Sequence, residues 1–153
     1  MRLIKLLSAF LILLAWQLGF ATNQNEIASK VVQVSAVRIN NEITRDKKAQ
    51  VFMDLQNTGK IGHTLIAAYS PVADQVQIHE PEQHGKTIVM KQGNSLLIPA
   101  QKDEDLHYGG IHLMLIGMQE PLANHQEVPL TLIFSDGSWL SIDASVFSAP
   151  PTA

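Results

Sequence analysis

Apolar residues in the central part of the chain recur at every second position, and this alternation restricts the fold more than any other feature. Val51, Met53 and Leu55 are spaced two residues apart before the turn segment Asn57-Thr58-Gly59. A period of two is that of a β-strand with one buried face, whereas a helix repeats about every 3.6 residues. No segment shows a helical pattern of convincing length, so the pattern predicts strands.

The same alternation returns in residues 76–79, in residues 111–116 and between Val128 and Val146. In the last of these segments it is interrupted by Asp136-Gly137, which predicts a hairpin with a two-residue turn. Strands this short and this regularly spaced predict an all-β domain, an antiparallel Greek-key sandwich or small barrel of about seven strands.

The chain begins with the composition of a secretory signal. Two basic residues lie in Met1-Arg2-Leu3-Ile4-Lys5, an apolar stretch follows from Leu6 to Leu18, and small residues at Gly19 and Ala21 fit a cleavage site. We therefore expect residues 1–21 to be removed on export to the periplasm. A retained membrane anchor is the alternative, but the apolar stretch is shorter than the roughly 20 residues that a spanning helix needs.

The rest of the chain reads as one domain between two short end segments. Residues 22–30 predict a flexible N-terminal lead, residues 31–147 hold the strands, and residues 148–153 predict a disordered tail. Without the signal, nine of the eleven basic residues remain against fourteen acidic ones, a net charge of −5. This balance argues against nucleic acid or an anionic membrane surface as a partner.

The chain has no cysteine, so it forms no disulfide and offers no thiol to acylate as in a lipoprotein. Any soft-metal site in it must therefore use methionine sulfur.

One strand carries an imidazole and a thioether on the same face. His112 and Met114 are two positions apart, so they point the same way and lie roughly 6 to 7 Å apart. Ile111, Leu113 and Leu115 point to the opposite face, which the apolar pattern assigns to the core. A lone methionine on a strand is usually packing and a lone histidine an ordinary polar residue, so this pair alone is weak evidence for a metal site.

Two further residues extend the pattern. His79 ends an alternating strand, and Met90 follows it after ten intervening residues; twenty-one residues then precede His112, and one separates it from Met114. This spacing, H-x10-M-x21-H-x-M, resembles the signature of the periplasmic copper chaperones called PCu(A)C. The resemblance covers roughly residues 51–146.

Three segments support the resemblance: SPVADQVQIHE (70–80), GGIHLML (109–115) and VPLTLIF (128–134). Two positions depart from the family pattern, because Glu80-Pro81 stands where a methionine is frequent and Tyr108 where a proline is frequent. These departures concern the rim of the site, and all four ligand positions are intact.

The resemblance implies a cupredoxin-like fold in which His79, Met90, His112 and Met114 bind Cu(I). It also implies a chaperone rather than an enzyme, which delivers copper to the binuclear centre of cytochrome c oxidase, through its subunit II, or to another copper chaperone. We expect a monomer that does not contact a membrane after signal cleavage.

The residue types agree with this assignment independently of the family. Cu(I) accepts thioether sulfur and imidazole nitrogen, whereas Mg²⁺ and Ca²⁺ require oxygen. A blue-copper site needs a cysteine thiolate, which this chain lacks. A catalytic metal usually keeps an open position beside a general base, and no such motif is present.

Three alternatives stay open from the sequence. The domain can be a secreted β-sandwich interaction module, a copper storage or tolerance protein without a delivery role, or a zinc enzyme that uses His79, His112 and a loop histidine. The remaining histidines are most simply solvated loop residues, although one of them could join a second, Cu(II)-type site: His63, His84, His107 and His125. Met53 is assigned to the core, and the acidic run 103–105 to a solvated turn.

Overall fold

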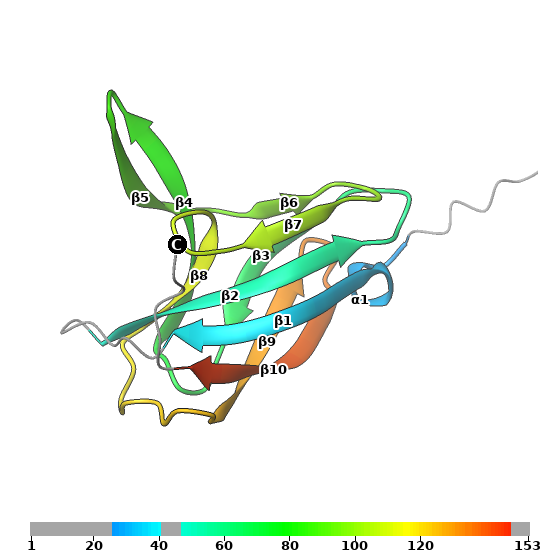
Figure 1. The fold of residues 1–153 in the computed structure, drawn as a ribbon. Helices are drawn as coiled ribbons and strands as arrows, with labels where there is room; N and C mark the ends of the chain where they lie inside the picture. Colours follow the sequence, from blue (N-terminus) through cyan, green and yellow to red (C-terminus); the bar gives the residue numbers. More distant parts are fainter. Residues whose placement is uncertain (1–25, 41–46, 148–153) are drawn as a thin grey trace, which may run out of the picture.

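The computed structural model describes residues 26–40 and 47–147 (Figure 1). It contains one short helix and ten strands in these residues: α1 (Ala28–Val31), β1 (Val32–Asn40), β2 (Lys48–Asn57), β3 (His63–Tyr69), β4 (Gln75–His84), β5 (Thr87–Gly93), β6 (Leu96–Ile98), β7 (Asp103–Leu106), β8 (His112–Ile116), β9 (Glu127–Phe134) and β10 (Trp139–Phe147). In this part of the chain no helix has the length and apolar character needed to cross a membrane. The predicted signal (1–21) and tail (148–153) lie outside the described residues.

Seven of the strands form a ring. They are hydrogen-bonded in the order β4-β8-β2-β1-β10-β9-β3, and pairing of Ala68 with Val76 joins β3 back to β4. The other three are additions, since β5 extends β4, β6 extends β3 and β7 pairs with β2. The predicted all-β fold is thus confirmed, and the three strands added to the ring account for the difference between ten and about seven. One pairing differs from a purely antiparallel sheet, because β1 and β10 run parallel.

The alternating apolar residues fill the interior of the ring. Val51, Met53 and Leu55 on β2 are fully buried and belong to the core, as do Leu113 and Leu115 on β8. This confirms the prediction that these alternating apolar side chains of β2 and β8 face the core. A ring of strands buries one face of each strand and leaves the other for solvent or for function.

The turn between β9 and β10 has three residues rather than the predicted two. Ile133 pairs with Trp139, and the Phe134 N–H donates to Ser138 O, so the turn comprises residues 135–137. Gly137 has φ +82°, and its N–H donates to Phe134 O. A turn closed by a glycine in the left-handed region is the common three-residue hairpin connection, which the sequence Asp-Gly also permits.

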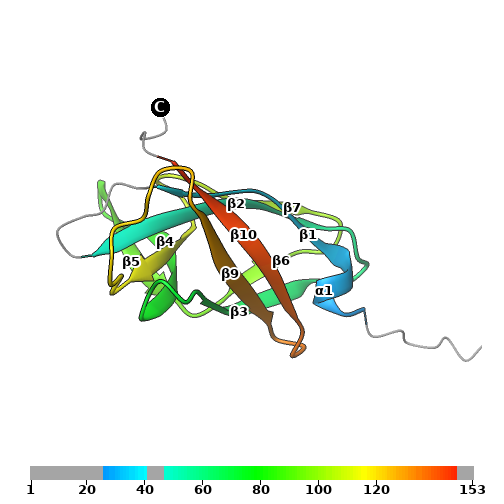
Figure 2. The ribbon, with the colours of Figure 1, turned by 90° about the horizontal axis from the view of Figure 1, so that it is seen from below.

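The last part of the predicted N-terminal lead is part of the domain. Ala28 is fully buried in α1, and its N–H donates to Asp136 Oδ2 at 2.7 Å. The Ser29 N–H donates to Ser138 Oγ, which holds α1 beside the β9–β10 turn (Figure 2). Backbone groups make these contacts, so the polar composition of residues 22–30 gave no sign of them.

Strands β4 and β5 continue beyond the ring as a projecting hairpin (Figure 1). Their register runs from Ile78 opposite Gly93 to His84 opposite Thr87. One face of this hairpin carries charge, since Lys91 contacts Glu82 at 2.8 Å and Glu80 at 3.4 Å, and His84 contacts Glu82 at 2.8 Å. The other face carries His79, Pro81 and Met90, which have the opposite strand parity.

Truncation of Leu113 to alanine is expected to lower the free energy of unfolding by about 2 to 5 kcal/mol, because its side chain is fully buried between strands and leaves a cavity. Urea denaturation measures this loss. Leu97→Ala is the matched control: Leu97 is 57% exposed on β6, so its truncation should change stability by less than about 0.5 kcal/mol. Equal losses in the two variants would contradict the assigned core.

Candidate metal centre

The two histidines of the motif are direct neighbours across strands β4 and β8. His79 pairs with His112 in the antiparallel register, and their ring centroids are 5.6 Å apart with an interplanar angle of 55°. The core positions beside them, Ile78 and Leu113, are paired in the same ladder and are buried. The apolar alternation therefore sets both imidazoles on the face away from the core.

The two methionines are diagonal neighbours of His79 in the same sheet. Met114 lies two residues beyond His112 on β8, opposite Gln77, and Met90 lies on β5 opposite Pro81. Diagonal neighbours on one sheet face are about 7 to 8 Å apart, which long side chains can span. His79 thus has all three other candidate ligands as direct or diagonal neighbours. Met90 is the outermost of the four, since it lies on the edge strand β5 and is 39% exposed.

His112 is less accessible than its strand parity suggested. His112 is fully buried and packs edge-on against Phe52, with ring centroids 6.2 Å apart. Phe52 is also fully buried but is not part of the core cluster. The Nδ1 atom of His112 is 2.9 Å from Gly110 O. A carbonyl only accepts, so Nδ1 carries the proton and Nε2 keeps its lone pair. The preceding Gly109 has φ +77°, a conformation that glycine adopts without strain and that shapes this turn.

Two glutamines that the sequence did not single out contact the imidazoles. Gln77 Oε1 is 3.1 Å from His79 Nε2, and Gln50 Nε2 is 3.5 Å from His112 Nε2. Both glutamines are cross-strand partners of Met114, from β4 and β2 respectively. Gln77 could have been found from its spacing of two from His79, whereas Gln50 depends on the β2–β8 register, which the sequence does not show.

Burial lowers the pKa of both site histidines. The pKa of His79 falls below 6.5 chiefly through desolvation, and secondarily through repulsion from His112 and Lys48. Desolvation also lowers the pKa of His112; the hydrogen bond to Gly110 opposes this shift and His107 adds to it. Both rings are therefore neutral at pH 7, with a nitrogen lone pair available to a metal ion.

The other histidines do not build a second site in the described residues. His63, predicted to be a solvated loop residue, is instead buried at the start of β3, with its Nδ1 3.8 Å from Asp136 Oδ2. This prediction was wrong because His63 belongs to strand β3 and pairs with Ile98 of β6, and a polar residue beside a turn segment gives no sign of this long-range pairing. His84, His107 and His125 are exposed, and within residues 26–40 and 47–147 no three His, Asp or Glu side chains are grouped to hold a metal ion. The zinc-enzyme hypothesis, which needs a third histidine, gains no geometric support.

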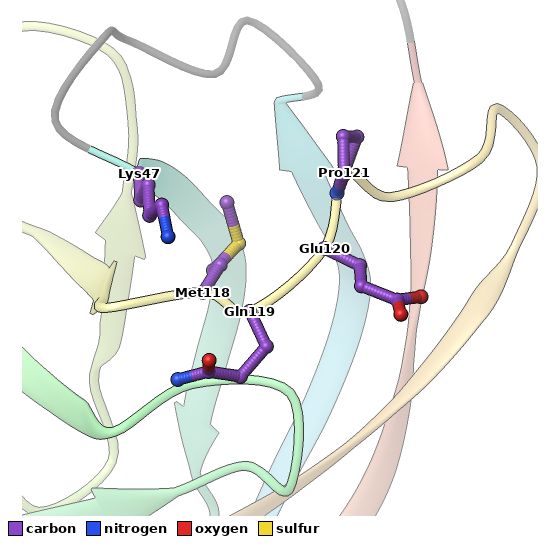
Figure 3. A pocket seen from close by; sticks show the side chains of 5 residues that line it. All are labelled: Lys47, Met118, Gln119, Glu120 and Pro121. Carbon is purple, nitrogen blue, oxygen red and sulfur yellow. The ribbon is translucent and has the colours of Figure 1, made fainter.

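A pocket of about 110 Å³ lies near the other end of β8 (Figure 3). It is lined by Lys47, Met118, Gln119, Glu120 and Pro121. None of these residues belongs to the proposed ligand set, and Met118 is buried in the core. The pocket is therefore separate from the histidine pair.

Solved structures with the same architecture include copper-binding domains. The copper-bound PCuAC domain from PmoF2 gives a TM-score of 0.67 at 19% identity, covering 81% of this chain and 98% of that one. The Cu(I) form of DR1885 from Deinococcus radiodurans gives 0.65 at 25% identity, covering 84% of this chain and 85% of that one. The class defined by the fold is therefore a β-domain of PCuAC architecture, which confirms the fold implied by the motif resemblance.

Residues 32–146 match the family described as "LpqE-like: Putative lipoprotein LpqE-like", and the chain belongs to this family. A curated relative, "Putative lipoprotein Lxx21020" from Leifsonia xyli subsp. xyli (strain CTCB07), is 36% identical over 88 residues, 57% of this chain. The chain spans about half of that relative, 53% of its length. Both names refer to lipoproteins, whereas this chain contains no cysteine that could be acylated.

The metal-free protein is expected to lose stability as the pH falls below 6.5. Because the native pKa values of His79 and His112 are lowered, the unfolded chain binds more protons than the native one in this range, and the free energy of unfolding decreases with decreasing pH. Urea denaturation at pH 7.5 and 5.5, with a chelator present, measures the difference.

His112→Asn should reduce this difference between the two pH values, whereas His84→Asn, which removes an exposed imidazole on the hairpin, should retain it. A difference that is unchanged by His112→Asn would show that the buried imidazole is not its source.

Proposed function

We propose that this protein is an exported Cu(I) chaperone that binds one copper ion through His79, Met90, His112 and Met114 and delivers it to an acceptor protein. The observation that carries the proposal is the cross-strand pair His79–His112, with a methionine diagonal to His79 on each side. Two neutral imidazoles and two thioethers form a donor set suited to a soft monovalent ion.

The electrostatics of the pair also support a metal role. Two imidazoles with centroids 5.6 Å apart would repel each other if both were protonated, and the lowered pKa values keep them neutral. A neutral pair with a fixed Nδ1 proton on His112 resembles metal-binding histidines generally, in which a carbonyl orients the ligand ring. The named neighbours that bind copper, the PmoF2 domain and DR1885, share the fold.

The exposure of one candidate ligand supports a carrier role. Met90 is 39% exposed on a projecting hairpin, so a partner can reach this ligand without opening the domain. Thioethers bind weakly enough to be replaced one at a time by stronger ligands of an acceptor. We propose that the acceptor is the binuclear copper centre of cytochrome c oxidase, that the chaperone acts as a monomer, and that delivery takes place in the periplasm after removal of residues 1–21.

Titration of the protein with Cu(I) against a chromogenic chelator tests the binding step. The wild type is expected to bind one equivalent, and His79→Ala and Met114→Ala are each expected to weaken binding about tenfold or more, which is about 1.4 kcal/mol. His84→Ala is the matched control, because this exposed histidine lies on the charged face of the same hairpin. Binding that is unaffected by His79→Ala, or abolished by His84→Ala, would overturn the proposed site.

A transfer assay tests delivery separately from binding. The Cu(I)-loaded protein is mixed with the purified copper domain of oxidase subunit II, and the copper content of each is measured after separation. Delivery predicts that copper moves to the acceptor at a rate above that of its release to free chelator. Tight binding with no accelerated transfer would favour a storage or tolerance role instead.

A further inference from the structure

The side chain of Gln77 contacts Nε2 of His79, the imidazole nitrogen directed toward Met114. His79 Nε2 is 3.1 Å from Gln77 Oε1, and Gln77 is the cross-strand partner of Met114. His79 Nε2 therefore points along β4 toward the cross-strand pair that Gln77 forms with Met114. In the metal-free protein a glutamine amide occupies the position beside this nitrogen.

The orientation of the Gln77 amide determines where the His79 proton lies. The Gln77 Nε2 group donates to Gln75 Oε1 at 3.1 Å, so its oxygen faces the imidazole. An amide oxygen only accepts, so His79 Nε2 must carry the proton and donate. His112 has the opposite tautomer, because its Nδ1 donates to Gly110 O. The two paired imidazoles thus differ: His112 Nε2 is unprotonated and has only the 3.5 Å contact with Gln50, whereas His79 Nε2 is protonated and donates to Gln77.

We propose that Gln77 is a positioning residue that competes with Cu(I) for His79, so that His79 leaves the copper ion before His112 does. The inference rests on the proposed function and concerns how the same site lets copper go. When His79 Nε2 binds copper, the Nε2–H···Oε1 hydrogen bond breaks and the proton moves through water to Nδ1, so no net proton is lost. When copper leaves, the proton returns to Nε2 and the hydrogen bond to Gln77 forms again.

The contacts of the second imidazole support this order of release. Gln50 Nε2 is 3.5 Å from His112 Nε2, a longer contact that does not require a proton on that nitrogen. His112 is also fully buried and held by Gly110, whereas His79 is only partly buried. Formation of the Gln77 hydrogen bond at 3.1 Å offsets part of the cost of breaking the bond from copper to His79. The Gln50 contact with His112 is at the 3.5 Å limit of a hydrogen bond and compensates less.

The test replaces Gln77 by leucine, which has a similar size and cannot accept a hydrogen bond. Cu(I) affinity is expected to rise about fivefold, which is about 1 kcal/mol, and the rate of transfer to a chelator to fall by a similar factor. Gln92→Leu is the matched control, because Gln92 is the cross-strand partner of His79 on β5 and makes no side-chain hydrogen bond among the described residues. It should leave both quantities unchanged.

A measurement without copper reads the tautomer directly. Long-range ¹H–¹⁵N spectra of the metal-free protein should show His79 protonated at Nε2 and His112 at Nδ1, and Gln77→Leu should shift His79 toward a mixture while His112 stays unchanged. Equal or weaker copper binding by Gln77→Leu, or a His79 ring protonated at Nδ1 in the wild type, would overturn the proposal. A wild type that binds no Cu(I) but shows the expected tautomers would instead refute the proposed function.

Discussion

The antiparallel pairing of β4 with β8 is the constraint on which the candidate site depends. It joins two segments that are more than thirty residues apart and sets His79 opposite His112. The register is held by the buried partners Ile78 and Leu113, which alternate with the histidines. A slip of one residue in either strand would turn that strand's imidazole into the core and expose its apolar neighbour, so hydrophobic burial and site geometry are enforced by the same pattern.

The candidate ligands differ in how tightly the fold holds their side chains. His112 is buried against Phe52 and oriented by Gly110 O. It belongs to β8, a strand of the ring that is paired on both sides, with β4 and β2. Met90 lies on β5, the outer strand of the projecting hairpin, where most side chains are exposed. His79 lies between them, on the strand that belongs to both the ring and the hairpin. A site built in this way can keep one ligand fixed while others exchange, as the proposed delivery of copper requires.

Much of this arrangement could be predicted from sequence because it depends on strand parity alone. Parity set His112 and Met114 on one face and Leu113 on the other, and the structure bears out that division. The burial of His112 could not be predicted, because it depends on Phe52 of β2 and on the loop that ends at Gly110. The Gln50 contact was missed for the same reason, since non-local register is not visible in one segment. His63 was misassigned because a polar residue beside a turn signal gives no indication that tertiary packing will bury it.

X-ray absorption spectroscopy of the Cu(I)-loaded protein is the most direct measurement of the proposed centre. A copper ion bound by His79, His112, Met90 and Met114 should show nitrogen scatterers at about 2.0 to 2.1 Å together with sulfur scatterers at about 2.3 Å. The sulfur contribution should decrease in Met114→Ala, while the nitrogen contribution remains. A spectrum with nitrogen and oxygen scatterers alone would contradict a centre built on thioethers, and with it the proposal that the protein carries Cu(I).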